Sequence, residues 1–118
     1  MKYYCIGIKG TGMSTLAQIL YDLGNEVSGY DDARGHKFTQ DGLEKRGIPI
    51  YYDHDHEIDK DTIVTYSVAF KEDHEEMQRV KKLGLKIKNM LKSWVMLLIC
   101  LIPLELVEHM VKQQLHQL

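Results

Sequence analysis

Gly7-Ile-Lys-Gly-Thr-Gly-Met-Ser-Thr-Leu-Ala-Gln-Ile-Leu20 is the stretch of this 118-residue chain that decides its fold. It overlaps the end of a short apolar segment, Tyr3–Ile8, which has the length and composition of a buried strand ending at glycine. Beyond the glycines, apolar residues recur at helical spacing up to Gly24, where a helix is expected to stop. The stretch therefore predicts a tight turn between a buried strand and an amphipathic helix. The apolar face of that helix consists of Met13, Leu16, Ala17, Leu20 and Leu23.

Four more segments in residues 1–88 have the short apolar character of strands, and helix-like segments separate most of them. Pro49 favours an edge position for the strand that contains it. The order β-α-β-α-β followed by β-α-β predicts an α/β fold, a Rossmann-like doubly wound parallel sheet of about five strands with helices on both faces. The four further strands are predicted at Glu26–Tyr30, Ile48–Tyr52, Thr62–Ser67 and Leu85–Lys88.

Two further helices are predicted from signals at their ends. Thr39 is positioned to cap a short helix that ends at Gly47. Asp73 and Glu76 have the spacing of a capping box at the start of a helix that Gly84 closes. This second helix carries its apolar residues, Met77, Val80 and Leu83, at helical spacing.

Three features fall at the carboxyl ends of predicted parallel strands: the turn Gly7–Ser14, Asp31 and Ser67. Ligands of doubly wound sheets bind there, near the switch in strand order. Glycines let the backbone approach a pyrophosphate, and the following helix start offers free N–H groups and a positive dipole end. Lys9 adds a positive charge and Ser14 a hydroxyl. The turn thus predicts a site for the phosphates of a nucleotide-linked ligand, the simpler alternative being a tight turn that holds no ligand.

The spacing of the glycines bears on which nucleotide is bound. A dinucleotide fingerprint has the form Gly-x-Gly-x-x-Gly, with an acidic residue about 20 positions further on. The glycines here are Gly7, Gly10 and Gly12, which is a different spacing. Asp31 nevertheless stands where it could bind a ribose hydroxyl. A small NAD(P)-binding regulatory domain is therefore the alternative function.

Asp53-His-Asp-His-Glu57 is the segment most suggestive of a metal site, because imidazole and carboxylate groups are both usable ligands. In an extended conformation its histidines share one face and its acids the other. Nothing in the sequence fixes a third and fourth ligand, so a solvated loop is the favoured interpretation and no metal is predicted. Ser67 lacks a nucleophile elbow and Cys5 lies inside a strand, so no catalytic residue is predicted either.

The overall composition argues against several classes of protein. The formal net charge is -2 and the isoelectric point is near 6.3, which speaks against a nucleic-acid or membrane-surface partner. Two cysteines provide no disulfide framework, and the start of the chain lacks the long apolar segment of a signal peptide. A reducing cytoplasm is the expected location.

Residues 89–118 differ in composition from residues 1–88. They carry only four charged side chains, and all nine glycines of the chain lie at or before Gly84. Trp94–Leu104 is an apolar run of about half the ~20 residues needed to cross a bilayer, and a weakly amphipathic helix is expected over 105–118. The chain is therefore divided into a folded domain, residues 1–88, and a tail, residues 89–118, whose apolar run is expected either to pack on the sheet or to promote self-association.

Four motifs occur together in this sequence: Gly7–Ala17, Val27-Ser-Gly-Tyr-Asp31, Phe38-Thr-x-x-Gly-Leu43 and Val64-x-Tyr-Ser-x-Ala69. In combination they resemble the amino-terminal domain of the Mur ligases, over residues 2–88. They favour the branch that joins L-alanine to UDP-N-acetylmuramate, and the related branch that attaches a tripeptide to the same UDP-sugar stays open. The resemblance implies a role in synthesis of bacterial cell-wall peptidoglycan, and so in cell shape and division. In that family the first domain holds the UDP-sugar, the central domain binds ATP and magnesium, and the third binds the amino acid. The reaction passes through an acyl-phosphate.

The resemblance also assigns roles to individual residues of this chain. Asp31 and Ser67 would lie beside the uridine end of UDP-N-acetylmuramate, and Lys9 joins the residues expected to bind that substrate. No Gly-Lys-Thr loop for ATP occurs in the sequence. The chain is therefore expected to hold the substrate without ATP, Mg²⁺ or another cofactor, and not to form the amide bond alone. The diphosphate would face Gly10, Thr11, Gly12, Met13 and Ser14.

The tail is compatible with a shifted copy of such an ATP loop. In the family, Gly-Thr-His-Gly-Lys-Thr-Thr-Thr-Thr follows the fifth strand within about thirty residues. Ordinary codons for Val107–Gln117, read two nucleotides later, can encode that run. The codons of Met110 and Val111 encode the glycine before the lysine in the shifted frame, whichever valine codon is used. We therefore expect residues 89–118 to be out-of-frame translation after an extra nucleotide near Lys88. The alternative is a genuine C-terminal helix, and the nucleotide sequence of the gene decides between them.

Overall fold

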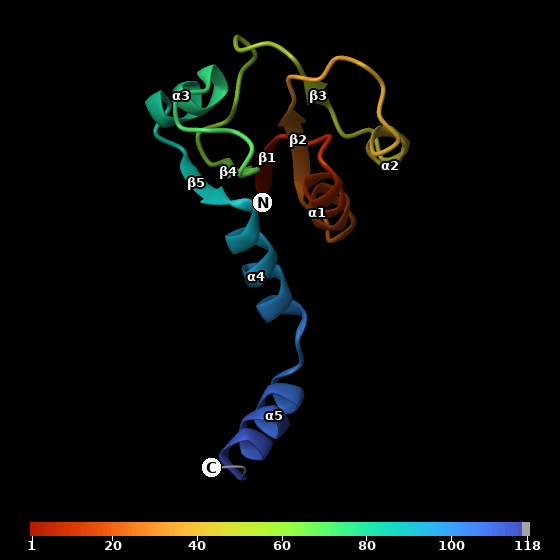
Figure 1. Cartoon of the computed structure of the whole chain (residues 1–118), viewed down its shortest axis with the longest axis vertical. Coiled ribbons are helices and arrows are strands. Elements are labelled where there is room, and N and C mark those ends of the chain that lie inside the picture. Colours follow the sequence, from red (N-terminus) through yellow and green to blue (C-terminus); the bar gives the residue numbers. More distant parts are fainter. Residues whose placement is uncertain (117–118) are drawn as a thin grey trace.

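Five parallel strands form a sheet in the computed structural model of the chain, which describes residues 1–116 (Figure 1). The strands are β1 (Lys2–Ile6), β2 (Glu26–Tyr30), β3 (Ile50–Tyr51), β4 (Ile63–Tyr66) and β5 (Lys86–Asn89). Their order in the sheet is β3-β2-β1-β4-β5, and every neighbouring pair is parallel. This confirms the Rossmann-like doubly wound sheet predicted from the alternation of strands and helices.

Helices pack on both faces of the sheet and bury its two apolar surfaces. β1 lies between them and alternates sides, because successive residues of a strand point to opposite faces. Cys5 belongs to the core on one face, and Tyr4 and Ile6 belong to the core on the other. The Cys5 face carries α1 (Thr11–Asp22), α2 (Gln40–Lys45) and α4 (Met90–Leu101), and the Tyr4 face carries α3 (Glu75–Lys82).

The predicted strand Ile48–Tyr52 is shorter in the structure, where β3 contains only two residues. It forms an edge of the sheet, as Pro49 predicts. The carbonyl oxygen of Pro49 accepts a hydrogen bond from the Gly29 N–H at 3.1 Å. Because proline has no N–H to donate, pairing on this strand begins with a carbonyl, and an edge strand tolerates the missing donor.

Neither predicted capping hydrogen bond forms. Thr39 occupies the cap position of α2, as predicted, but its hydroxyl donates to the Lys9 carbonyl oxygen at 2.6 Å and makes no hydrogen bond to the helix. α3 is capped by His74 and not by Asp73: the Nδ1 atom of His74 accepts a hydrogen bond from the Glu76 N–H at 3.0 Å. The side chain of Glu76 does not reach back to the cap, because it is fully buried and binds groups under the helix.

Strand β2 passes very close to the end of β1 and the residues that follow it. A Cβ atom added at Gly29 would lie 2.5 Å from the Cys5 carbonyl oxygen and 2.5 Å from Cδ1 of Ile8. The carbonyl belongs to the β1–β2 pair and cannot move without disturbing the sheet. Glycine at this position therefore lets Ile8 pack onto the sheet directly beside the turn.

Replacing Gly29 by alanine is expected to destabilise the protein by about 1–3 kcal/mol, the usual cost of overpacking, because both contacts must open. Gly35→Ala is the matched control, since a Cβ atom there would meet no atom within 4 Å. Chemical denaturation of the two variants measures the difference. Equal stability of Gly29→Ala and Gly35→Ala would contradict the close approach of β2 to β1.

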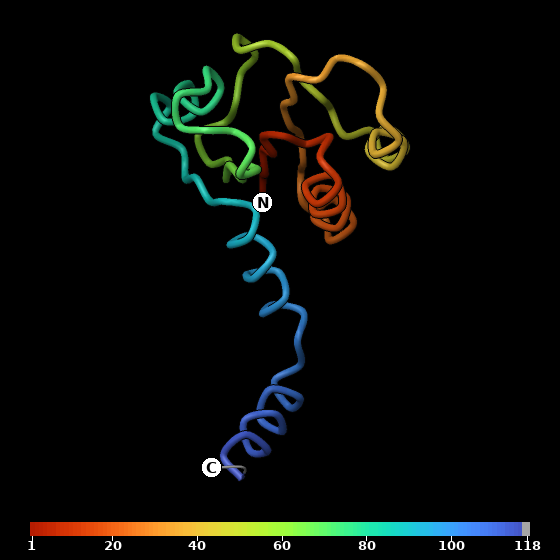
Figure 2. The backbone as a smooth tube through the Cα atoms, in the orientation of Figure 1, coloured from red at the N-terminus to blue at the C-terminus, as the bar shows by residue number. Residues whose placement is uncertain are grey.

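The tail leaves the sheet as two helices. α4 follows β5 directly and contacts the sheet: the Ser93 hydroxyl donates to Thr65 Oγ1 at 2.8 Å, and Leu97 is buried in the core. α5 (Leu104–His116) has no buried residue and projects away from the sheet (Figure 2). The helix predicted over 105–118 is confirmed as far as His116, and residues 117 and 118 lie outside the described part of the chain.

Within residues 1–116, no single helix is long and apolar enough to cross a membrane. α4 and α5 reach that length and composition only when they are taken together, and a bend of 101° separates them. Both helices expose apolar side chains, so the self-association expected for the tail stays a prediction. These exposed side chains include Leu98, Ile99, Leu104, Val107 and Val111.

The two cysteines differ in their access to solvent. Cys5 is buried in β1, where burial raises the pKa of its thiol to about 12, and Cys100 in α4 is exposed. Because the thiolate is the reactive form, one thiol per chain is expected to react with Ellman's reagent in the folded protein near neutral pH, and the second only after unfolding. Rapid reaction of both thiols in the native protein would contradict the burial of Cys5.

Candidate functional site

The glycine turn after β1 lies at the switch in strand order, between β2 and β4. Gly7 has a φ of +89°, a conformation that favours glycine, and its N–H donates to the Tyr30 carbonyl oxygen at the end of β2, at 2.7 Å. A Cβ atom on Gly7 would lie 2.9 Å from Phe70 Cε1 and 3.0 Å from Ser67 Cβ, just beyond the end of β4. The turn therefore fills the space between the carboxyl ends of two strands, where only a glycine fits.

Helix α1 begins directly after this turn, and no side chain caps it. Gly10 occupies the cap position in an extended conformation, and the Ser14 N–H bonds back to its carbonyl oxygen at 2.8 Å. The N–H groups of Thr11, Gly12 and Met13 come before that bond and have no acceptor within the helix. Gly10 and Thr11 are exposed. This helix start is therefore open to solvent, and its positive dipole end favours an anion.

The side chains of Met13 and Ser14 are both buried and do not face such a site. Met13 packs in the core beneath α1. The Ser14 hydroxyl donates to the Thr39 carbonyl oxygen at 3.0 Å and accepts a hydrogen bond from Gln18 Nε2 at 3.1 Å. The hydroxyl expected to face the phosphates is thus engaged with the loop that follows β2.

Lys9 is almost completely buried, with 1% of its surface exposed. Its ammonium donates to the carbonyl oxygens of Ala33 and Gly35, the latter at 3.1 Å. The same group lies 4.6 Å from the centre of the Tyr52 ring, which adds a cation–π contact. The charge of Lys9 is therefore held inside the protein, against the loop after β2, and is not presented on the surface of the turn.

Asp31 and Ser67 follow the ends of β2 and β4, the two strands that flank β1. Both carboxylate oxygens of Asp31 accept main-chain hydrogen bonds, from the Lys9 N–H at 2.9 Å and from the Ala33 N–H at 3.0 Å. Ser67 is half-buried, and its hydroxyl oxygen accepts a hydrogen bond from the Ala69 N–H at 3.3 Å. Both residues therefore lie beside the turn, and the Asp31 carboxylate holds the loop after β2 against it.

A buried polar network under α3 was not predicted from the sequence. One carboxylate oxygen of Glu76 accepts hydrogen bonds from the Tyr4 hydroxyl at 3.0 Å and from Arg79 Nη2 at 2.7 Å. The other oxygen lies 2.5 Å from His54 Nδ1, and Arg79 also donates to the His56 carbonyl oxygen at 2.8 Å. Burial, together with the negative charge of Glu76, raises the pKa of Tyr4. These five residues, called the Glu76 network below, tie α3 to β1 and to the loop after β3.

The solvated loop predicted for Asp53–Glu57 is wrong for its two histidines. His54 joins the Glu76 network, and the ring of His56 stacks on Tyr51 with centres 3.8 Å apart. The alternation of histidine and acid correctly indicates two faces, since the three acids are exposed. The only His, Asp and Glu group with metal-ligand spacing among residues 1–116 lies elsewhere, and all its members are exposed: His36, Asp41 and Glu44.

A second set of contacts joins the end of β2 to the start of α3. The Tyr30 hydroxyl donates to Asp32 Oδ1 at 2.5 Å, and His74 Nε2 lies 2.9 Å from Asp32 Oδ2. Burial and the hydrogen bond to Asp32 raise the pKa of Tyr30. Burial acts to raise the pKa of Asp32, but the hydrogen bonds from Tyr30 and His74 hold it below its ordinary value. Because His74 also caps α3, these contacts fix the position of that helix relative to β2.

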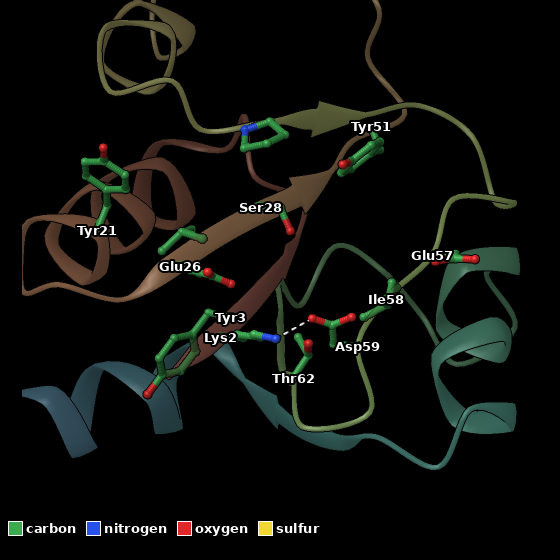
Figure 3. A pocket seen from close by; sticks show the side chains of 12 residues that line it. Lys2, Tyr3, Tyr21, Glu26, Ser28, Tyr51, Glu57, Ile58, Asp59 and Thr62 are labelled. Atoms are coloured by element: carbon green, nitrogen blue, oxygen red, sulfur yellow. Dashed lines mark hydrogen bonds and ion pairs between the residues drawn. The ribbon is translucent and has the colours of Figure 1, made fainter.

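A separate hollow of about 350 Å³ lies at the opposite, amino-terminal edge of the strands (Figure 3). Lys2 at the start of β1 and Glu26 at the start of β2 line it, and Lys2 forms an ion pair there with Asp59. None of the residues predicted to bind the substrate lines this hollow. It is therefore distinct from the glycine turn at the carboxyl ends of the strands.

A model of the Mur ligase family, catalytic domain, matches residues 2–97 of this chain. The protein therefore belongs to the Mur ligase family. The match continues beyond Lys88, where the sequence composition suggests a boundary, and ends within α4.

Among solved structures, the chain is similar to the UDP-N-acetylmuramate–alanine ligase of Thermotoga maritima, with 32% sequence identity and a TM-score of 0.70. That match covers 80% of this chain and 22% of the ligase. A murein peptide ligase of Psychrobacter arcticus shares the fold, with 24% identity and a TM-score of 0.61, over 75% of this chain and 18% of that one. The chain thus spans about a fifth of the length of these two proteins.

Substituting Glu76 by glutamine is expected to lower the free energy of unfolding by about 2–4 kcal/mol, because Arg79 would lose its buried counter-charge. Glu72→Gln is the control, since the carboxylate of Glu72 forms only an exposed ion pair with Lys81, and this variant should match the wild type. Denaturant unfolding monitored by circular dichroism gives both values. A Glu76→Gln variant of unchanged stability would show that the network contributes nothing to folding.

Proposed function

We propose that this chain is the substrate-binding first domain of a UDP-N-acetylmuramate–L-alanine ligase of peptidoglycan synthesis, and that it binds UDP-N-acetylmuramate at the start of α1. The observation that carries the proposal is the uncapped helix start behind the glycine turn, at the switch point of a parallel sheet. Membership of the Mur ligase family and the similarity to the Thermotoga maritima ligase support a UDP-sugar as the ligand.

In this proposal the diphosphate lies against the N–H groups of Thr11, Gly12 and Met13. These groups have no acceptor within the helix, and charge-assisted hydrogen bonds to phosphate are stronger than those to water. The positive end of the α1 dipole adds to the attraction. The uridine end then extends between Asp31 and Ser67, whose backbones approach the turn from the two neighbouring strands.

Side chains of this chain bind and orient the substrate, and they do not supply the chemistry of amide formation. In the family, ATP and Mg²⁺ are bound by the central domain, and no Gly-Lys-Thr loop occurs in this sequence. We therefore propose that the chain alone binds the UDP-sugar without ligating L-alanine to it. Its place of action would be the cytoplasm, without a nucleic-acid or membrane partner.

Out-of-frame translation of residues 89–118 is also a proposal. It is supported by the low charge of this segment and by α5, which buries none of its residues. The contacts of Ser93 and Leu97 with the sheet favour the alternative, a genuine C-terminal helix. The gene sequence past Lys88 tests the proposal: an open frame two nucleotides later should encode Gly-Lys-Thr, and its absence would refute the frameshift.

An NAD(P)-binding domain is the competing function. Such a domain would use Asp31 to bind ribose hydroxyls. Both oxygens of that carboxylate already accept hydrogen bonds from main-chain N–H groups, and little of the residue is exposed. The spacing Gly7, Gly10 and Gly12 also differs from the dinucleotide fingerprint. Both observations speak against an NAD(P) site.

UDP-N-acetylmuramate is expected to raise the melting temperature of the chain, with a shift that grows with ligand concentration, because a ligand that binds only the folded state stabilises it by RT ln(1 + [L]/Kd). NADH at the same concentration should leave the melting temperature unchanged. Differential scanning fluorimetry measures both. Stabilisation by NADH alone would overturn the proposed function in favour of the alternative.

Thr11→Glu provides the site control for this experiment, because it places a negative charge at the exposed helix start where the phosphates would bind. The acidic side chain suits a helix start, so the variant should fold, but it should abolish the shift caused by UDP-N-acetylmuramate. Thr15→Glu adds the same charge one helical turn away, at an exposed position, and should retain the shift. Equal responses of the two variants would place the ligand elsewhere.

A further inference from the structure

The ammonium of Lys9 is buried beside the glycine turn without a carboxylate partner. Among residues 1–116, no ion pair involves this group. Its donors meet the carbonyl oxygens of Ala33 and Gly35 and the face of Tyr52. Carbonyl dipoles and an aromatic face stabilise a cation but do not cancel its charge. The positive charge of Lys9 therefore lies within the loop that borders the site, without a direct ion pair.

Every polar group of Lys9 is bonded to the segment that follows β2. Its N–H donates to Asp31 Oδ2 at 2.9 Å, and its carbonyl oxygen accepts from the Thr39 hydroxyl at 2.6 Å. Its ammonium holds the carbonyl oxygens of Ala33 and Gly35. One residue of the turn therefore fixes the path of the chain from position 31 to position 39.

The negative charge of Asp31 affects the binding of anionic ligands at the start of α1. Asp31 is buried in the same loop, and its carboxylate would repel phosphate groups placed at the neighbouring helix start. Its oxygens accept hydrogen bonds from main-chain N–H groups, which stabilise the negative charge but do not neutralise it. The Lys9 ammonium, which binds the same loop at Ala33 and Gly35, carries the opposite charge and offsets that of Asp31, so that the dipole of α1 is left to attract an anion.

We propose that Lys9 is a positioning residue that makes the turn selective for a diphosphate, by offsetting the Asp31 charge and fixing the 31–39 loop without touching the ligand. This deepens the proposed function, on which its relevance to a UDP-sugar rests. A diphosphate carries more charge than a monophosphate and a nucleoside carries none, so the effect of Lys9 should grow with the number of phosphates.

Isothermal titration calorimetry with inorganic pyrophosphate, UDP and uridine tests this in the wild type, Lys9→Met and Lys9→Gln. Methionine retains the length of the side chain, and glutamine retains a donor for the loop carbonyls, but both lack the charge. Each variant should bind pyrophosphate and UDP about tenfold more weakly and uridine within about twofold of the wild type. Lys37→Met, which removes an exposed lysine from the same loop, should bind all three ligands as the wild type does.

Equal weakening of UDP and uridine would overturn the proposal, because it would mean that Lys9 only maintains the fold. Unchanged binding of pyrophosphate by both variants, or its absence in the wild type, would overturn it too. Circular dichroism of each variant establishes that it is folded. Pyrophosphate binding that depends on Lys9, without any binding of UDP-N-acetylmuramate, would support the role of Lys9 while refuting the proposed function.

Discussion

The backbone of Gly7 passes between the ends of β2 and β4 so closely that no side chain fits, and the rest of the site depends on this contact. The Tyr30 carbonyl oxygen holds the turn from one side, and Ser67 and Phe70 close on it from the other. The chain must then turn sharply and start α1 directly after Gly10, without a side-chain cap. The strand order therefore determines the turn, and the turn determines where α1 starts. The free N–H groups of that helix start lie at the carboxyl ends of the strands, where parallel sheets bind their ligands.

Buried polar contacts hold the loops around this turn in place. Lys9 and Asp31 fix the loop after β2, and the Glu76 network with His74 fixes α3 and the loop after β3. In the described part of the chain, no buried side-chain nitrogen or oxygen lacks a hydrogen-bond partner. Because an unpaired buried polar group is costly, these contacts specify one arrangement of the loops. Loops held in one arrangement bind a ligand with a smaller loss of conformational freedom.

The sequence predicted the elements governed by local periodicity and failed where a residue finds a distant partner. The glycine turn, the apolar face of α1 and the edge position at Pro49 follow from short-range chemistry, and the structure has them. Glu76 was assigned to a cap because its distance from Asp73 is local, whereas its actual partner Tyr4 comes from a strand 72 residues earlier. Likewise, nothing local shows that the ammonium of Lys9 turns into the protein.

A titration of the ¹⁵N-labelled chain with UDP-N-acetylmuramate, followed by amide chemical shifts, locates the ligand residue by residue. We expect binding at the start of α1, with the largest shifts at Thr11, Gly12 and Met13, whose N–H groups precede the first hydrogen bond of the helix. Lys2 and Glu26, at the opposite edge of the sheet, should not respond. Shifts centred on that opposite edge, or none at saturating ligand, would contradict this expectation.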